Sequence, residues 1–538
     1  MTRMMGRVLG VIAGLMAGLG AASAIAGAPY PVVEKSVSQL QADMTAGKVT
    51  SEALVRAYLA RIRAVDRSGP TLRSVIALNP HALADARRLD GERRAGHVRG
   101  PLHGVPVLVK DNIETDDGTA TTAGSLALKD NVTLRDAPVI ARLKAAGAVI
   151  LGKTNLSEWA NIRSDHSISG WSGVGGLVKN PYALDRNACG SSSGTGAAIA
   201  ASLAAVGVGT ETDGSVTCPS AFGALAGLKP TVGLVSRTHV IPISHSQDTP
   251  GPMGRSVTDI AILLGAMAGS DPADPATAGA DAHKSDYVAA LNGASLKGKR
   301  LGVLTFATGI LPGVDAEFAK ALDTLRAQGA VIVELKDYKP PTDLGDDELV
   351  VMLTELKADL NTYLASTPPA VKTRTLADVI VFNAATPREL ALFGQQLFAQ
   401  AEVTKGLDDP AYLKARADSL RAAGAEGIDK LLADNHLDAL IAPSYGPPYR
   451  VDVATGDHDL GGASTLPAIA GYPHLTVPMG QTYGLPVGLS FVGPAWSEAR
   501  ILALGYAFEQ ATHARKPPTY ANSVETTPEV AAAFAPAK

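Results

Sequence analysis

Hydrophobic positions along this chain switch repeatedly between two spacings. Short continuous apolar runs predict buried β-strands at residues 105–111, 148–151, 299–306, 330–337, 437–444 and 484–494. Apolar side chains at helical intervals predict helices at residues 37–65, 137–147, 314–328 and 497–512. Strands that alternate with helices predict α/β layers around one buried sheet.

Residues 340–435 break this alternation. They are rich in helix-forming and charged residues and contain few candidate strands. No Gly/Pro-rich linker separates them from the flanking segments, so an independent domain is not indicated. We expect them to form a helical cover over a functional site.

The N-terminus has the pattern of a secretory signal peptide. Arg3 and Arg7 precede an apolar run that ends at Leu19, and small residues in an A-x-A arrangement follow. The sequence therefore predicts a signal peptide at residues 1–26 and a mature chain at residues 27–538. The alternative is an uncleaved membrane anchor, although the apolar run is short for a span. We expect a periplasmic or secreted protein with no stable membrane association after cleavage.

Composition narrows the classes of partner. The 538 residues are 46% hydrophobic and 19% charged, with a formal net charge of −4, which is typical of a globular chain with a large core. There is no block of Lys and Arg, so we expect no nucleic-acid partner. Small or neutral partners fit this composition better.

The sequence has two cysteines, Cys189 and Cys218, and their pairing is open. An exported protein permits a disulfide between them, but nothing in the sequence fixes their separation. Free, buried thiols are the favoured interpretation.

Three familiar motifs fit the sequence poorly. Residues 147–154, "GAVILGKT", match the P-loop letter for letter, but the four middle residues are apolar and predict a strand where a P-loop needs its glycine-rich turn. The eleven histidines show no zinc-binding spacing, so we expect no metal. No serine lies in a G-x-S-x-G elbow, which argues against an α/β-hydrolase.

A Ser/Gly-rich run inside an apolar segment is the remaining feature. Residues 188–219, "ACGSSSGTGAAIAASLAAVGVGTETDGSVTCP", begin like a flexible linker and continue like a packed interior. A serine becomes a nucleophile when a base removes its proton, and lysine can be that base if burial keeps it neutral. Lys110 ends the apolar run Val105–Val109. An ordinary solvated lysine at a strand end would look the same.

Taken together, these residues resemble the amidase signature family. Ser191 in "CGSSSGTG" and Ser215 in "GTETDGS" are 24 residues apart, as in the family, and "GPLHGVPVLVKDN" (100–112) resembles the segment that carries the family's catalytic lysine, here Lys110. Further resemblances lie at residues 147–160, 227–236, 248–259 and 484–493. The resemblance implies one domain over residues 27–538, with a large, mixed and twisted β-sheet between α-helices.

The resemblance also implies a mechanism. Ser215 would attack an amide carbonyl and form an acyl-enzyme, while Ser191, on a non-proline cis peptide, would pass a proton between Lys110 and Ser215 and then to the departing amine. The implied oxyanion hole consists of the backbone N–H groups of Thr212, Asp213, Gly214 and Ser215. No cofactor is implied, and the implied partner is a small-molecule or peptide amide substrate.

The sequence departs from the family pattern near the nucleophile. Glu211 and Asp213 replace the Asp and the first Gly of the usual D-T-G-G-S run, and Thr217 lies where many members have Arg. These variants look most like those of bacterial peptide amidases, which remove the C-terminal amide of peptides. The alternatives are a broad-specificity aliphatic or aryl amidase or esterase, and a non-catalytic or transamidation-complex subunit.

Overall fold

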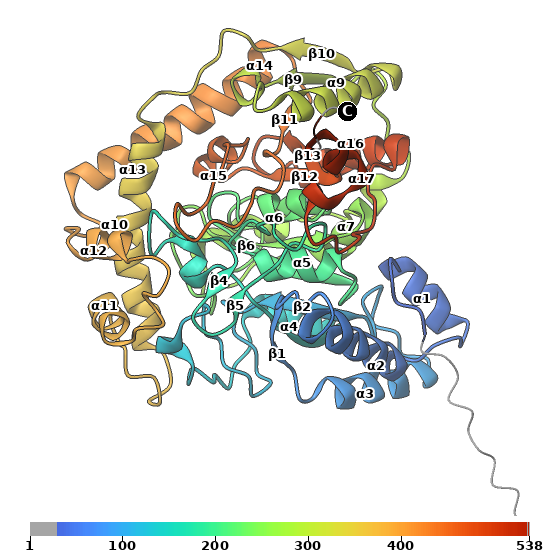
Figure 1. Ribbon diagram of the computed structural model, residues 1–538, viewed down its shortest axis with the longest axis vertical. Helices are drawn as coiled ribbons and strands as arrows, with labels where there is room; N and C mark the ends of the chain where they lie inside the picture. The colour runs from blue at the N-terminus through green and yellow to red at the C-terminus, as the bar shows by residue number, and fades with distance from the viewer. Residues whose placement is uncertain (1–29, 535, 537–538) are drawn as a thin grey trace, which may run out of the picture.

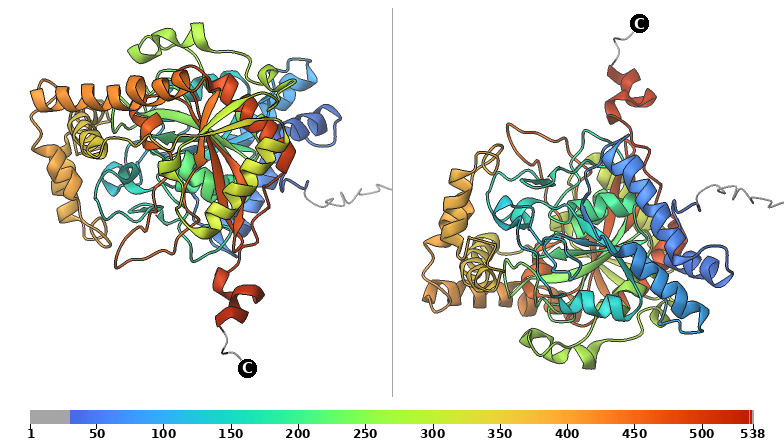
Figure 2. Two further views of the ribbon diagram at one scale, coloured as in Figure 1. Left: turned by 90° about the horizontal axis from the view of Figure 1, so that it is seen from above. Right: turned by 90° about the horizontal axis from the view of Figure 1, so that it is seen from below.

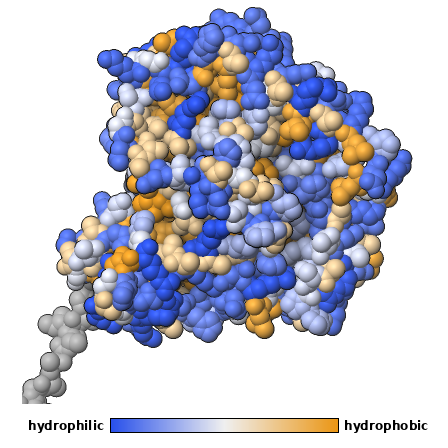
Figure 3. Space-filling model, turned by 180° about the vertical axis from the view of Figure 1, so that it is seen from behind, coloured by the Kyte–Doolittle hydropathy of each residue, from blue (hydrophilic) through white to orange (hydrophobic). Residues whose placement is uncertain are grey.

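A computed structural model describes residues 30–534 and 536 of the chain (Figure 1). The predicted signal peptide at residues 1–26 lies outside the described residues, and so does its cleavage site. Among the described helices, none has the length and the hydrophobicity that a membrane span requires. The rear face in Figure 3 is mostly hydrophilic, with hydrophobic side chains in scattered groups.

One mixed sheet organises the molecule. Within the described residues it has eleven strands in the order β1-β3-β2-β6-β8-β7-β12-β13-β11-β9-β10, and β4 pairs separately with β5. The strands are β1 (Val75–Leu78), β2 (Pro106–Lys110), β3 (Val149–Thr154), β4 (Trp171–Ser172), β5 (Gly176–Leu177), β6 (Val206–Glu211), β7 (Ala226–Lys229), β8 (Thr249–Gly254), β9 (Arg300–Val303), β10 (Val331–Glu334), β11 (Ala439–Pro443), β12 (His474–Thr482) and β13 (Leu485–Val492). Each strand that the sequence predicted overlaps one of these.

Helices cover both faces of the sheet, and Figure 2 shows the strands fanned between them. They are α1 (Val37–Thr45), α2 (Ser51–Arg61), α3 (Ala82–Arg94), α4 (Pro138–Ala145), α5 (Ser193–Ala200), α6 (Thr217–Phe222), α7 (Val257–Met267), α8 (Ala280–His283), α9 (Pro312–Ala327), α10 (Leu344–Ala365), α11 (Leu376–Ala385), α12 (Gln396–Glu402), α13 (Pro410–Ala423), α14 (Lys430–Asp434), α15 (Thr465–Ala470), α16 (Glu498–Thr512) and α17 (Pro528–Phe534). The α/β prediction and its mixed sheet between helices are confirmed.

The two faces of β12 show why both are covered. Leu475 and Val477 pack against Gly505 of α16, whereas Thr476 lies near Gly488 on the side of the sheet that holds α6. Side chains on a strand alternate between faces, so a strand that is buried on both faces needs a cover on each side. The hydrophobic core therefore lies above and below the sheet and runs from Val32 to Phe508.

The prediction of one helix over residues 37–65 is wrong in detail. The segment forms α1 and α2, with a break at residues 46–50, and a π-helical turn, Ile62–Arg67, follows α2. Gly47 has a φ of 69°, which ends α1, and the Thr50 side chain accepts a hydrogen bond from the backbone N–H of Ala53. The apolar spacing survives the break because apolar residues of both helices are buried in the same core cluster.

Residues 340–435 contain α10 to α14 and the π-helical turn Gly424–Asp429. We call this segment the helical cover; it forms the yellow and orange edge on the left of Figure 1. Leu356 and Leu360 of α10 pack in one cluster with Trp159, Ile162 and Ile243. The cover is thereby attached to loops that leave the sheet close to Ser215.

Candidate active site

Lys110 lies where two parallel strands end. β2 pairs in parallel with both β3 and β6, so the carboxyl ends of these strands meet at one edge of the sheet. Lys110 is the last residue of β2 and is completely buried. Its Nζ lies 2.8 Å from Oγ1 and 3.1 Å from the carbonyl oxygen of Thr210, near the end of β6.

Ser191 reaches the same edge from the start of α5. The Gly190–Ser191 peptide bond is cis, and Ser191 is also completely buried. Its Oγ lies 2.7 Å from Lys110 Nζ. A neutral amine has two N–H donors and one lone pair, so it can donate twice to Thr210 and accept the Ser191 hydroxyl proton. The three contacts of Lys110 match that pattern.

Burial sets the protonation of Lys110. It lowers the pKa of Lys110 to about 7, and the charges of Asp248 and Glu211 oppose this shift without cancelling it. A substantial fraction of the side chain is therefore neutral near neutral pH. A solvated lysine at a strand end, the alternative that the sequence left open, does not describe this residue.

Ser215 lies in the turn between β6 and α6, and it lines a cleft of about 340 Å³. Thr212, Asp213 and Gly214 line the same cleft. Among the described residues, the backbone N–H groups of Asp213, Gly214 and Ser215 have no acceptor within the chain. The structure therefore brings Lys110 and Ser191 into contact and places Ser215 on the open side of this edge.

Two carboxyl groups hold the turn that carries Ser215. Glu211 accepts hydrogen bonds from the backbone N–H groups of Val216 and Thr217, at 2.7 and 2.9 Å. Asp248 accepts one from Thr212 Oγ1 at 2.6 Å. The Thr217 hydroxyl lies 3.2 Å from Glu211. Two departures from the family pattern, Glu211 and Thr217, thus contact each other.

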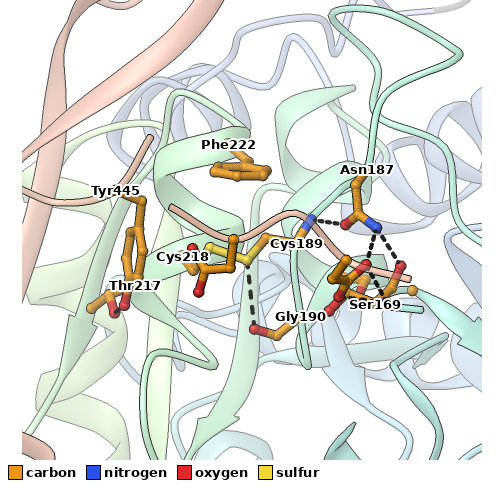
Figure 4. Close-up of a disulfide and its surroundings, with 12 residues drawn as sticks. Ser169, Asn187, Cys189, Gly190, Thr217, Cys218, Phe222 and Tyr445 are labelled. Atoms are coloured by element: carbon orange, nitrogen blue, oxygen red, sulfur yellow. Dashed lines mark hydrogen bonds between the residues drawn. A yellow bond between two sulfur atoms is a disulfide. The ribbon is translucent and has the colours of Figure 1, made fainter. Parts of the chain in front are cut away.

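Cys189 and Cys218 form a disulfide, so the prediction of free thiols is wrong (Figure 4). Their Cα atoms are 5.9 Å apart, although 29 positions separate them in the sequence. Both line the cleft, one just before Ser191 and the other just after Ser215. The sequence could not show this proximity, because it arises from the packing of α5 against α6.

The cover and a distant loop complete the cleft. Met352 of α10 and the loop residues Asp457 and Asp459 line it. Glu348 of α10 accepts a hydrogen bond from Gln247 Nε2 at 2.7 Å, and burial together with the nearby charge of Asp213 raises the pKa of Glu348 well above its usual range. Of these residues, sequence reasoning named only Asp213 and missed the others.

Sequence reasoning also missed Thr210 and Asn112, which lie against Lys110. Asn112 Nδ2 donates to Thr210 Oγ1 at 3.0 Å. The only signal for these two residues was their position at the ends of the segments that carry Lys110 and Ser215. The polar run "GDHDLGG" (456–462) was the only signal for the loop aspartates.

One group of potential metal ligands occurs among residues 30–534. His245, Glu355 and Asp359 place one ligand atom each within 4.8 Å of one another. The carboxyl group of Glu355 already accepts hydrogen bonds from Ser246 Oγ at 2.6 Å and from Tyr412 OH at 2.8 Å. We therefore infer that these three side chains hold α10 against residues 244–246.

Comparison with known proteins identifies the family. The profile described as Amidase matches residues 53–502. This chain belongs to the amidase signature family. As a member of the amidase signature family it is an amide-hydrolysing enzyme, which confirms the resemblance seen in the sequence.

Relatives match over most of their length. A probable amidase of Arabidopsis thaliana is 39% identical over 504 residues, which cover 91% of this chain and 92% of that protein. A putative amidase of Schizosaccharomyces pombe is 33% identical over 519 residues, 90% of this chain and 87% of that protein. The crystal structure of the native peptide amidase from Stenotrophomonas maltophilia is 50% identical, with a TM-score of 0.85, and covers 91% of this chain and 100% of that chain.

Proposed function

We propose that this chain is an exported serine amidase that hydrolyses the C-terminal carboxamide of peptides and releases ammonia. The observation that supports this proposal most directly is the 2.7 Å distance between Lys110 Nζ and Ser191 Oγ, which are both buried at the sheet edge beside Ser215. The similarity to a peptide amidase of Stenotrophomonas maltophilia supports a peptide on the acyl side. Because a disulfide persists in an oxidising compartment, the Cys189–Cys218 bond supports export.

The proton path follows from burial. Neutral Lys110 accepts the Ser191 proton, Ser191 in turn takes the proton of Ser215, and Ser215 Oγ attacks the amide carbon. The N–H groups of Thr212, Asp213, Gly214 and Ser215 bind the developing oxyanion, each contributing about 3 kcal/mol at the transition state. The proton then returns through Ser191 to the departing nitrogen, ammonia leaves, and water hydrolyses the acyl-enzyme.

Asp213 supports the choice of carboxamide over free acid. Its side chain lines the cleft and accepts a hydrogen bond from Thr465 Oγ1 at 2.8 Å. A substrate carboxylate beside this group would be repelled in a partly desolvated cleft, whereas a carboxamide would not.

An amidated dipeptide and its free acid test the proposal. The purified mature protein should release ammonia from the amide and leave the acid uncut. The acid should inhibit weakly, and Asp213→Asn should lower its inhibition constant about tenfold relative to the KM of the amide. Asn retains an acceptor for Thr465, and Asp408→Asn, an exposed residue on the cover, serves as the matched control.

Two results would contradict the proposal. A preference of tenfold or more in kcat/KM for fatty-acid or aryl amides over amidated peptides would leave a broad-specificity amidase. An N-terminus of the exported protein that still contains residues 1–26 would contradict cleavage of the signal peptide.

A further inference from the structure

The cleft beside Ser215 carries charge of one sign. Its lining includes the acids Asp213, Asp457 and Asp459, and among its described lining residues there is no Lys, Arg or His. A concave, partly desolvated wall of like charges concentrates its field in the space where a substrate binds. The cleft therefore favours a positively charged partner that its own lining does not supply.

Asp457 is held in place by hydrogen-bond donors. Its carboxyl group accepts from the backbone N–H of Ser169 at 3.0 Å and from Asn187 Nδ2 at 3.1 Å. Figure 4 shows Asn187 between Ser169 and Cys189, and the Asn187 side chain accepts a hydrogen bond from the Cys189 backbone N–H at 2.6 Å. These donors oppose the upward shift that burial causes in the pKa of Asp457, and they fix the position of its carboxyl group relative to the segment that leads to Ser191.

Asp459 adds a second carboxyl group from the same loop. Its Oδ1 accepts from the Gly461 N–H at 3.0 Å, and its side chain is exposed. Burial, and to a lesser extent the charge of Asp459, raises the pKa of both Asp457 and Asp213. All three acids line the same cleft, so their like charges repel one another.

Hydrogen-bond acceptors in the cleft also lack donors. In the part of the chain that the structure describes, Asp213 Oδ1 and Asn161 Oδ1 are buried without a hydrogen-bond partner, and both residues line the cleft. A buried acceptor without a donor costs free energy that a ligand N–H can recover. The unpaired acceptors call for an N–H donor on the ligand, and the acidic lining favours a donor that carries positive charge.

We propose that Asp457 and Asp459 form a subsite for a primary ammonium group of the substrate. The group is either the N-terminal ammonium of a short peptide amide or the side-chain ammonium of a lysine residue. A cleft of about 340 Å³ accommodates a peptide of a few residues between this subsite and Ser215. This inference rests on the proposed function, because it assumes that the acyl side of the substrate is a peptide.

Binding of peptide amides to the Ser215→Ala variant measures the effect of the ligand's ammonium charge on affinity in the absence of turnover. Isothermal titration calorimetry at pH 7, with a chelator present, compares three ligands: Ala-Phe-amide, N-acetyl-Ala-Phe-amide and N-acetyl-Lys-Phe-amide. At this pH a free α-amine, with an ordinary pKa of about 8, is mostly protonated. The variants Asp459→Asn, Asp457→Asn and the exposed control Asp408→Asn are added to the Ser215→Ala protein.

We expect at least one ammonium-bearing ligand to bind about tenfold more tightly than N-acetyl-Ala-Phe-amide. Asp459→Asn should remove most of this difference, Asp408→Asn should retain it, and the neutral ligand should bind all variants equally. The better of the two cationic ligands identifies the source of the ammonium. Equal binding of all three ligands, or an equal loss for neutral and cationic ligands in Asp459→Asn, would overturn the subsite.

Ammonia release from N-acetyl-Ala-Phe-amide by the unmodified enzyme separates this inference from the proposed function. Turnover of that neutral amide without any preference for an ammonium overturns the subsite and leaves the proposed function standing. Failure to cleave any peptide amide, together with a preference that Asp459→Asn abolishes, contradicts the proposed function and supports the subsite.

Discussion

The core around α5 and the helical cover are built in opposite ways. All eight residues of α5 are buried, and most are Gly, Ala or Ser, so this helix approaches its neighbours through its backbone. The cover instead contacts the core through large side chains, both apolar ones such as Leu356 and polar ones such as Glu348 and Glu355. Small residues fix the position of a helix because they let its backbone approach its neighbours closely. Long side chains fix it through contacts that another side chain can also make. The core should therefore tolerate much less change than the cover.

The largest expected difference between the core and the cover is the effect of replacing a lysine of each. Lys110→Ala and Ser215→Ala should each lower kcat by about 10³-fold or more, because the residues of the proposed triad would act as one unit. Lys357 of the cover also donates to a backbone carbonyl, that of Thr404, and Lys357→Ala should keep kcat within about twofold. Ammonia release measures the rates, and mass spectrometry should place a sulfonyl adduct on Ser215. Near-normal turnover by Lys110→Ala would refute the assignment.

Removing the disulfide should have the next largest effect. A crosslink between residues 29 apart restricts the unfolded chain by about 3–4 kcal/mol, so Cys189→Ala/Cys218→Ala should lower the free energy of unfolding by about that amount. Urea unfolding measures the loss, and kcat should fall as well, because both cysteines line the cleft. Unchanged stability and activity would show that the bond has no positioning role.

Two glycines within helices, one in α5 and one in α10, test whether α5 depends on close backbone packing. A Cβ on Gly194 of α5 would lie 2.3 Å from Asn155 O and 2.4 Å from Ser74 O, whereas a Cβ on Gly345 of α10 meets nothing within 4 Å. Gly194→Ala should lower the free energy of unfolding by about 1–3 kcal/mol. Gly345→Ala should be neutral or raise it by up to about 1 kcal/mol. Equal effects in urea unfolding would contradict the contrast.

The pH dependence of kcat/KM tests whether Lys110, and not His245 beside the cover, is the group whose protonation controls the rate. Because Lys110 must be neutral to accept a proton and burial lowers its pKa to about 7, kcat/KM should rise about tenfold per pH unit below that value and level off above it. A hydrogen bond to Asp359 raises the pKa of His245, so this histidine is the control for the assignment of the inflection to Lys110. His245→Gln should therefore leave the inflection in place. An optimum near pH 5 would be incompatible with a neutral lysine base.

Six strands of the main sheet (β2, β3, β9, β10, β11 and β13) could be predicted because each lies in a continuous apolar run. The segments that carry Lys110, Ser191 and Ser215 could be found because they lie within about a hundred residues of sequence. β8, with the sequence TPGPMG, could not. Its prolines pair with β6 alone, and β7 joins only at Met253 and Gly254. Proline is tolerated where one side of a strand is free, and no local pattern shows where that is.

The sequence by itself determined the layered fold and the family, and it predicted the triad of Lys110, Ser191 and Ser215, because periodicity and motif spacing are local properties of the chain. Only the tertiary structure decided the disulfide, the contacts of Lys110 with Ser191 and Thr210, and the acidic cleft wall at Asp457 and Asp459. Each of these joins segments that are distant in sequence, and the pKa of Lys110 depends on the burial that those segments create together.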